Sequence, residues 1–218
     1  RNAVPGRFAA VVSGDEHAKA ADYTVARQKV GIFEIVFDAA VLVWLTLGGG
    51  IARIGDVAAG MGGGPIVSGT VHVLGVFAVL ALLGLPMSLY RTFVLEQRFG
   101  FNRTSARVFL VDQLKGWALG LLLGGAVTAC VLWIMTSAGP RWWIVAWLAW
   151  MFFTLLMTWA WPRVFAPLFN RFTPLEDQAL RSRIDALLER CGFHTKSVFV
   201  MDGSKRSSHG NAFFTGFG

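Results

Sequence analysis

Four apolar stretches, each long enough to cross a lipid bilayer, constrain this chain more than any other feature of its sequence. They cover residues 30–54, 66–90, 107–135 and 142–165. A helix needs about 20 mainly apolar residues to span the hydrocarbon core. Only 15% of the residues are charged, whereas soluble domains carry about 25%. The sequence therefore predicts a mainly α, polytopic membrane protein with about four spans in this chain.

Lysines and arginines gather in alternate connections between these stretches. Five precede the first stretch, four lie at residues 91–107 around the second connection, and eight lie at residues 163–206 at and after the end of the fourth stretch, whereas the two remaining connections are flanked by or hold one each, Arg53 and Arg141. Because basic loops stay on the cytoplasmic side, the pattern predicts that both ends and the middle connection are cytoplasmic. The net charge of +7 thus reflects membrane topology. The predicted partner is the lipid bilayer, and nucleic acid is excluded.

Ionisable residues also occur inside the apolar stretches. Glu34 and Asp38 share one face of the first predicted span, and Asp112 and Lys115 are close together on the third. Such groups are costly at membrane depth and usually face a partner or a water-filled cavity. Two interpretations stay open: a polar interior enclosed by the helices, or local pairing, with Glu34 near Lys29 at the interface and Asp112 bound to Lys115.

Single residues within the spans carry less information. Cys130 and Cys191 are expected to be small buried residues, not a disulfide or a metal site. Pro86 is expected to kink or end the second helix near its cytoplasmic end.

The chain divides into a cytoplasmic segment 1–29, a transmembrane helical domain 30–168 and the start of an α+β domain 169–218. In the last part, Thr173 is the expected N-cap of a helix, with Pro174 at its first position and Glu176 closing a capping box. A strand is predicted over residues 197–201, then a basic loop, then a strand over residues 211–215. Because a lone terminal strand leaves unpaired backbone groups, we expect the chain to continue beyond Gly218.

Three motifs occur in an informative order: LPMSLYRTFVLEQRFGFNRTS (residues 85–105), APLFNRFTPLE (166–176) and GSKRSSHGNAFFTGFG (203–218). With them the sequence resembles the type I CAAX prenyl endopeptidases, membrane zinc metalloproteases of the gluzincin group, over nearly the whole chain. The resemblance implies a helical barrel around a water-filled chamber, with a thermolysin-like domain at its cytoplasmic mouth.

The resemblance also implies one zinc ion per complete enzyme, held by an H-E-x-x-H helix and a later glutamate. None of the four histidines begins such a motif. We therefore expect no catalytic and no metal-binding residue in this chain, and ligands downstream of Gly218. The chain alone is expected to be inactive.

Substrate recognition is what the resemblance assigns to this chain. Gluzincins hold the substrate as an added antiparallel strand, and Asn211, Ala212 and Phe213 match the strand that receives it. The other interpretation is that Asn211 only begins the strand. Lys205, Arg206 and His209 are candidates for contact with substrate or lipid, the alternative being a solvated loop.

The implied function is cleavage of peptide bonds near the C-terminus of prenylated CAAX proteins, so the implied partner is a peptide or a prenylated protein. Two alternatives remain: a quality-control membrane metalloprotease of the same superfamily, or a non-catalytic membrane scaffold or transporter. The Ala-, Gly- and Val-rich composition favours a bacterial cytoplasmic membrane, and the location in a eukaryote would be the endoplasmic reticulum. In either case the protease domain is expected on the cytoplasmic side.

Overall fold

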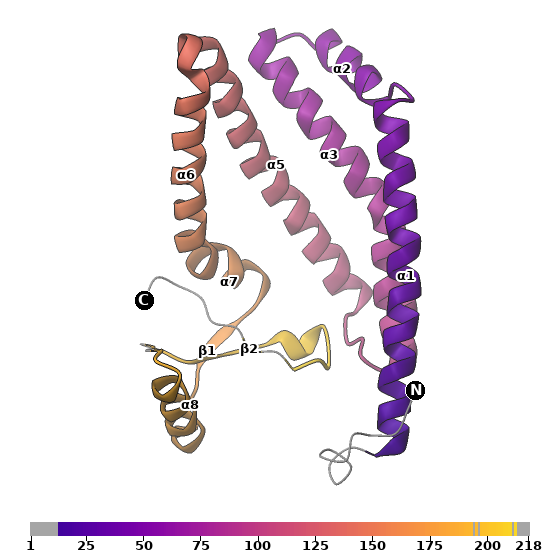
Figure 1. The fold of residues 1–218 in the computed structure, drawn as a ribbon, viewed down its shortest axis with the longest axis vertical. Coiled ribbons are helices and arrows are strands. Elements are labelled where there is room, and N and C mark those ends of the chain that lie inside the picture. The colour runs from indigo at the N-terminus through magenta and orange to yellow at the C-terminus, as the bar shows by residue number, and fades with distance from the viewer. Residues whose placement is uncertain (1–12, 194, 196, 211, 213–218) are drawn as a thin grey trace.

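The computed structural model describes residues 13–193, 195, 197–210 and 212. Long helices run side by side over most of its length, and a short two-stranded sheet with one further helix lies below the later helices, at the level of the lower part of the first (Figure 1). At the upper end, a short helix and tight connections join neighbouring helices. The sheet and its neighbouring loops are therefore confined to one end of the helices.

The first apolar stretch forms two helices. Helix α1 spans Gly14–Thr46 and begins with a capping box between Ser13 and Glu16. Helix α2 spans Gly50–Gly60, and the two are bent by 54°. Gly49 lies at the bend with φ 76°, a left-handed conformation that few residues other than glycine adopt. The predicted single span over residues 30–54 is thus a broken one.

The second stretch forms α3, Gly64–Tyr90. Pro86 is expected to kink or end the helix, and the structure shows that it does not end it. The helix continues through a π-helical turn η1, Arg91–Glu96, and a last α-helical turn α4, Gln97–Phe99. Gly100 stops it in a left-handed conformation with φ 78°. Neighbouring helices and local π adjustments can accommodate a proline in a membrane helix.

The third and fourth stretches form a helical hairpin. Helix α5 spans Ala106–Ser137 and begins at the N-cap Ser105. The 3₁₀ turn η2, Gly139–Arg141, leads into α6, Trp142–Ala160, the π-helical turn η3, Trp161–Phe165, and α7, Ala166–Phe169. α5 packs against α6 and α3, and α3 packs against α2. At Gly69 of α3 a Cβ atom would lie 2.7 Å from the side chain of Leu132, so glycine permits the close approach of α3 to α5.

After α7 the chain forms β1, Phe172–Pro174, helix α8, Gln178–Arg190, strand β2, Phe199–Met201, and the 3₁₀ turn η4, Gly203–Lys205. β1 and β2 pair antiparallel, with Thr173 opposite Val200. The predicted N-cap at Thr173 is therefore wrong. Asp177 caps α8 by accepting a hydrogen bond from the Leu180 amide, because Thr173 and Pro174 are extended in the sheet.

The accessible surface measures 15824 Å², whereas a compact soluble protein of this mass exposes about 9,900 Å². Three helical segments are long and apolar enough to span a membrane, and the bent pair α1–α2 makes up to four. Large apolar side chains on these helices are exposed, which suits contact with lipid. The chain is a multi-pass membrane protein with an open arrangement of helices.

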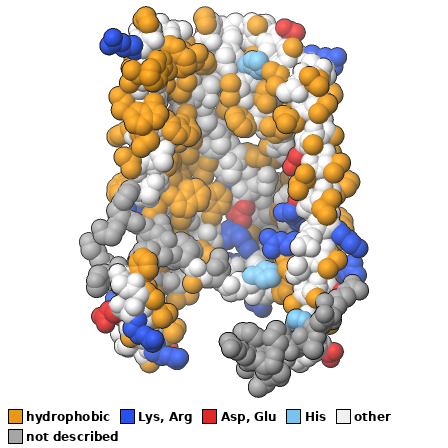
Figure 2. All heavy atoms as spheres, viewed as in Figure 1, with side chains coloured by type: hydrophobic (Ala, Val, Ile, Leu, Met, Phe, Trp, Pro, Cys, Tyr) orange, Lys and Arg blue, Asp and Glu red, His pale blue; other side chains and the backbone are white. Residues whose placement is uncertain are grey.

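Charge is distributed unevenly along the molecule. Figure 2 shows hydrophobic side chains over much of the upper part, some charged and His side chains at the upper end, and more Lys, Arg, Asp, Glu and His side chains in the lower part. Cys130 and Cys191 are exposed, not buried as expected. Their exposure on an open helical arrangement agrees with the large accessible surface.

Candidate functional site

The 203–209 loop docks on the 100–105 loop that joins α4 to α5. The backbone amide of Arg103 donates to the carbonyl of Arg206 over 3.0 Å, and that of Ser208 donates to the carbonyl of Phe101 over 3.0 Å. Asn102 and Ser207 form an isolated antiparallel bridge between these contacts. Backbone pairing thus holds the 203–209 loop at the end of the membrane helices.

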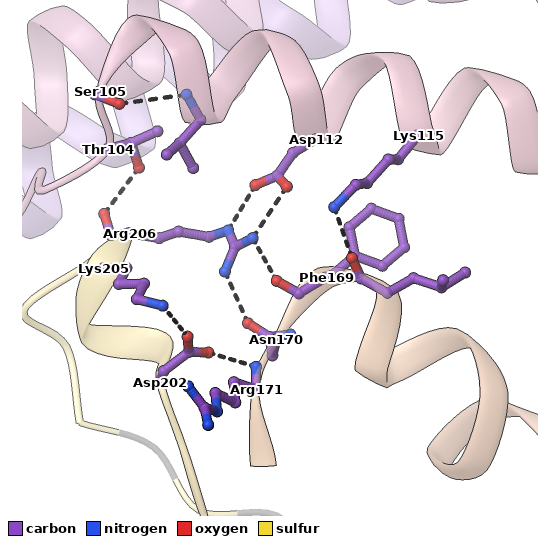
Figure 3. A network of polar contacts seen from close by, with 12 residues as sticks. Thr104, Ser105, Asp112, Lys115, Phe169, Asn170, Arg171, Asp202, Lys205 and Arg206 are labelled. Atoms are coloured by element: carbon purple, nitrogen blue, oxygen red, sulfur yellow. Dashed lines mark hydrogen bonds and ion pairs between the residues drawn. The ribbon is translucent and has the colours of Figure 1, made fainter.

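The guanidinium of Arg206 is the centre of this contact (Figure 3). Its Nε lies 2.6 Å from Oδ2 of Asp112 and its Nη2 lies 3.0 Å from Oδ1. Nη1 donates to Oδ1 of Asn170 over 2.8 Å, and Nη2 donates to the carbonyl of Phe169 over 2.6 Å. One side chain therefore joins three segments: the 203–209 loop, α5 and the end of α7.

The hydrogen bonds that Arg206 donates to Asp112 raise the pKa of Arg206 above its ordinary value, against the opposing effect of desolvation. The side chains of Arg206 and Asp112 are only 28% and 24% exposed. Two-point contacts between an arginine and a carboxylate are stronger than single neutral hydrogen bonds and fix orientation. This pair is a structural clamp between the loop and α5.

Asp202 holds the base of the same loop. Its Oδ2 lies 2.5 Å from Nζ of Lys205, and its Oδ1 accepts a hydrogen bond of 2.7 Å from the backbone amide of Arg171. These two contacts, the one from Lys205 being the larger, lower the pKa of Asp202. The carboxylate thereby ties the loop to the residue that precedes β1.

Asp112 and Lys115 do not form the pair within α5 that one interpretation allowed. Asp112 binds Arg206, and Nζ of Lys115 donates to the carbonyl of Leu168 in α7 over 2.7 Å. Asp112 and Lys115 thus both connect α5 to segments that follow α6. Likewise Glu34 of α1 forms an ion pair with Arg91 of η1. Asp38 is exposed.

A second polar group forms around Glu96 in η1. The hydroxyl of Tyr23 donates to Oε1 of Glu96 over 2.6 Å, and Nε2 of His209 lies 3.4 Å from Oε2. The rings of Tyr23, Phe101 and His209 are in contact, with centroids 4.1 Å apart for Phe101 and His209. His209 is thereby fixed against both α1 and η1.

The predicted site residues divide into two groups. Lys205, Arg206 and His209 lie in the contacts just described, with Lys205 66% exposed and bound to Asp202. Asn211 and Phe213 of the predicted substrate-binding strand lie outside the described residues, and Ala212 is exposed. The assignment of this strand to the substrate stays a prediction.

Tyr23, Glu96, Asn170 and Asp202 were not selected from the sequence as site residues. Asp112 was noted only as an ionisable residue in an apolar stretch, and that is the signal that leads to its partner. Tyr23 and Glu96 lie in segments that contain many other polar residues, so they do not stand out as polar residues in an apolar stretch.

A metal site requires several donor side chains close together. Among residues 13–193, 195, 197–210 and 212, no three His, Cys, Asp or Glu side chains come together as metal ligands. The residues present do not fit the zinc ion that the resemblance implies, since catalytic zinc takes three protein ligands. What the described arrangement can do is anchor the 203–209 loop and bind charged groups beside it.

Residues 1–171 match the family model described as CAAX prenyl protease N-terminal, five membrane helices. The chain is 34% identical to a CAAX prenyl protease 1 homolog of Oryza sativa over 98% of this chain and 52% of that protein. It is 31% identical to the Mus musculus homolog over 98% of this chain and 46% of the relative. CAAX prenyl protease 1 of Saccharomyces cerevisiae is 41% identical over 66% of this chain and 32% of its own length.

The fold has a solved counterpart. The crystal structure of S. mikatae Ste24p superposes with a TM-score of 0.86 at 29% sequence identity, covering 98% of this chain and 51% of that one. The chain thus spans about half the length of the relatives that it matches over most of its own length. The similarity extends through the membrane helices and the segments that carry the Arg206 and Glu96 contacts.

Proposed function

This chain belongs to the CAAX prenyl protease family, and from that membership we propose that it is the membrane and substrate-cleft half of a membrane zinc metalloendopeptidase. The proposed substrates are prenylated CAAX proteins, cleaved near their C-terminus. The lipid bilayer holds the enzyme, and the prenyl group would hold the substrate at the same surface. Both reactants then meet at a membrane interface.

The observation that carries this proposal is the anchoring of the 203–209 loop by Arg206. The loop leads directly into residues 211–213, the predicted substrate-binding strand. The two-point pair with Asp112 and the contact with Asn170 tie it to the end of α5 and α7. A peptide added to that strand would lie next to the ends of the membrane helices, where the body of a lipid-anchored substrate emerges.

In this proposal Asn211, Ala212 and Phe213 bind the substrate backbone as an added antiparallel strand. The Asn211 side chain can both donate and accept, so it can fix one peptide group in register. Main-chain hydrogen bonds recognise an extended backbone and do not depend on the side chains of the peptide. This mode of binding suits a protease that acts on several substrates.

The zinc ion belongs to the proposal for the complete enzyme only. When bound by three protein ligands, such an ion would activate a water molecule for attack on the peptide bond. The resemblance to the family implies ligands downstream of Gly218, and we propose that they are there. The role proposed for this chain is to bind and orient the peptide.

The basic residues of the loop have different roles. The guanidinium of Arg206 is engaged with Asp112, Asn170 and the Phe169 carbonyl, so we propose that it anchors the loop. Lys205 is 66% exposed and borders an open hollow of about 510 Å³ formed with the 167–172 segment and Asp202. Lys205 is therefore the better candidate for contact with an anionic lipid head group. We propose that this end of the molecule is cytoplasmic, as the basic connections predict.

The experiment uses the full-length protein purified in detergent. It is incubated with a peptide that ends in a farnesylated CAAX sequence and with the same peptide lacking the farnesyl group. Cleavage of the farnesylated peptide, lost after treatment with a zinc chelator and restored by zinc, is the expected result. Equal cleavage of both peptides would favour the quality-control protease. No cleavage of either, with no bound zinc by metal analysis, would favour a non-catalytic scaffold or transporter.

A further inference from the structure

A small pocket lies between α1, η1 and the 203–209 loop. It is lined by Tyr23, Arg27, Arg91, Leu95, Glu96 and His209 and has a volume of about 260 Å³. Clefts for drug-sized ligands measure about 300–1,000 Å³, so this pocket is smaller. It suits a group of the size of one amino-acid residue and not a prenyl chain.

Two arginines, Arg27 and Arg91, line the pocket. Arg91 binds Glu34 through Nη2, and its Nε is buried with no acceptor among the described residues. Arg27 has no carboxylate within 4.0 Å in the described part of the chain. A guanidinium presents five N–H donors in a planar fork that matches a carboxylate. The pocket can therefore bind an anion.

The acidic residue of the pocket is already engaged. Glu96 accepts the hydroxyl hydrogen of Tyr23 at one oxygen and lies 3.4 Å from His209 at the other. Both carboxylate oxygens of Glu96 are therefore in contact with these two side chains. Glu34 similarly is bound to Arg91. Among the described residues that line the pocket, Arg27 is a charge without an ion-pair partner, which makes an incoming anion favourable there.

The pocket lies on the side where the C-terminal end of a bound peptide is expected. In an antiparallel pair the substrate runs opposite to the strand, so its C-terminus points toward residues that precede Asn211. In a CAAX sequence the carboxylate follows the cysteine by the residues a, a and X, about 10 Å of extended chain. If the cysteine lies opposite Ala212, the last residue lies opposite His209, which lines the pocket.

We propose that this pocket binds the C-terminal carboxylate of the peptide substrate through Arg27 and Arg91. The proposal rests on the proposed function and adds a specificity determinant to it. A protease that binds the free carboxylate measures the distance from the chain end to the scissile bond. A peptide with a free carboxylate at that distance is then a better substrate than the same peptide with a blocked C-terminus.

The test compares two farnesylated CAAX peptides that differ only at the C-terminus, one a free acid and the other an amide. The full-length enzyme in neutral detergent should cleave the acid with a kcat/KM roughly 10- to 150-fold higher, since charge-assisted hydrogen bonds have that effect. Arg27→Gln should bring the acid-to-amide ratio close to one, and Arg27→Lys should retain part of it. Arg107→Gln, an exposed arginine at the start of α5 and outside the pocket, should keep the wild-type ratio.

Equal cleavage of acid and amide by the wild type would overturn the inference and leave the proposed protease function intact. Cleavage of neither peptide would contradict the proposed function, on which the inference rests. A wild-type ratio retained in Arg27→Gln would locate carboxylate binding elsewhere. An effect of Arg27→Gln seen only in vesicles with anionic lipid, and equal for both peptides, would assign the pocket to a lipid phosphate.

Discussion

Arg206 and Asp112 are 94 residues apart in the chain, yet their side chains form a two-point ion pair with distances of 2.6 and 3.0 Å. The pair joins the segment after the sheet to the third membrane-spanning helix. In the described part of the chain, neither residue forms a second ion pair. The position of the 203–209 loop therefore depends on this one contact and the hydrogen bonds around it.

Replacing Arg206 with glutamine should loosen the loop. The loss of charged hydrogen bonds from a half-buried pair costs about 1.5–3 kcal/mol, which lowers the melting temperature of a chain of this size by roughly 3–12 °C. The measurement is thermal unfolding in detergent, together with limited proteolysis of the 203–209 loop. Lys205→Gln is the matched control, because this exposed side chain should cost less than about 0.5 kcal/mol.

The same change made in an Asp112→Asn background should cost little more than Asp112→Asn alone, because the two residues act on each other. If the two effects add fully, the pair does not hold the loop and the clamp is wrong.

Asp202 predicts a dependence on pH. Its pKa in the folded protein is lowered, chiefly by Lys205 and next by the Arg171 amide. A lowered pKa stabilises the fold above the ordinary value of 3.8, and this contribution disappears as the pH falls through the folded-state pKa. Hydrogen exchange at the Arg171 amide should therefore be constant near neutral pH, after correction for intrinsic rates, and its protection should decrease below about pH 4.

Asp202→Asn removes the titrating group, so this decrease in protection should be absent from the variant. A decrease of the same size in the variant would show that another group is responsible.

The topology can be tested by cysteine labelling at two positions that the structure makes suitable. Met61, 69% exposed between α2 and α3, and Arg103, exposed in the 100–105 loop, both have ordinary backbone angles, unlike Gly62 with φ 74°. In a background without Cys130 and Cys191, Met61→Cys and Arg103→Cys should react with an impermeant reagent from opposite sides of the membrane. Reaction from the same side would contradict the predicted orientation.

The proposed substrate contact of Asn211 is tested in the full-length enzyme. Asn211→Ala should remove one or two hydrogen bonds to the peptide and reduce kcat/KM roughly 5- to 150-fold. Zinc content and melting temperature should hardly change. Phe213→Ala is the contrasting variant, because an apolar core residue should lower stability first. Full activity of Asn211→Ala, or activity lost only in step with unfolding, would contradict substrate binding by Asn211.

The membrane-spanning helices were predictable, because an apolar stretch of about 20 residues has few other structures available to it. α3, α5 and α6 confirm three of the stretches. The bend in the first was not foreseen, since it depends on the left-handed Gly49, and a glycine run allows but does not require such a bend. The sequence around Pro174 is compatible with the start of a helix and with an edge strand. In the structure Pro174 lies in the strand β1, opposite Phe199 of β2.

The candidate site was less predictable, for a physical reason. Ionisable residues in apolar surroundings indicate that a partner exists but not which residue it is. The choice of Arg206 for Asp112, or Arg91 for Glu34, follows from the packing of helices that are far apart in the sequence. The strand of Asn211 and Phe213 lies outside the described residues, so its assignment stays a prediction.

The π-helical turn at Arg91–Glu96 has a consequence for how this chain tolerates changes in length. Such a turn accommodates one residue more than an α-helix does over the same rise. Deleting a single residue within this turn would restore an α-helix and leave the segment after it in place, whereas deleting one residue from α3 would rotate whatever follows by about 100°. After a deletion in α3, Glu96 would turn away from Tyr23 and His209. The π-helical turn should therefore tolerate a one-codon deletion better than α3 does.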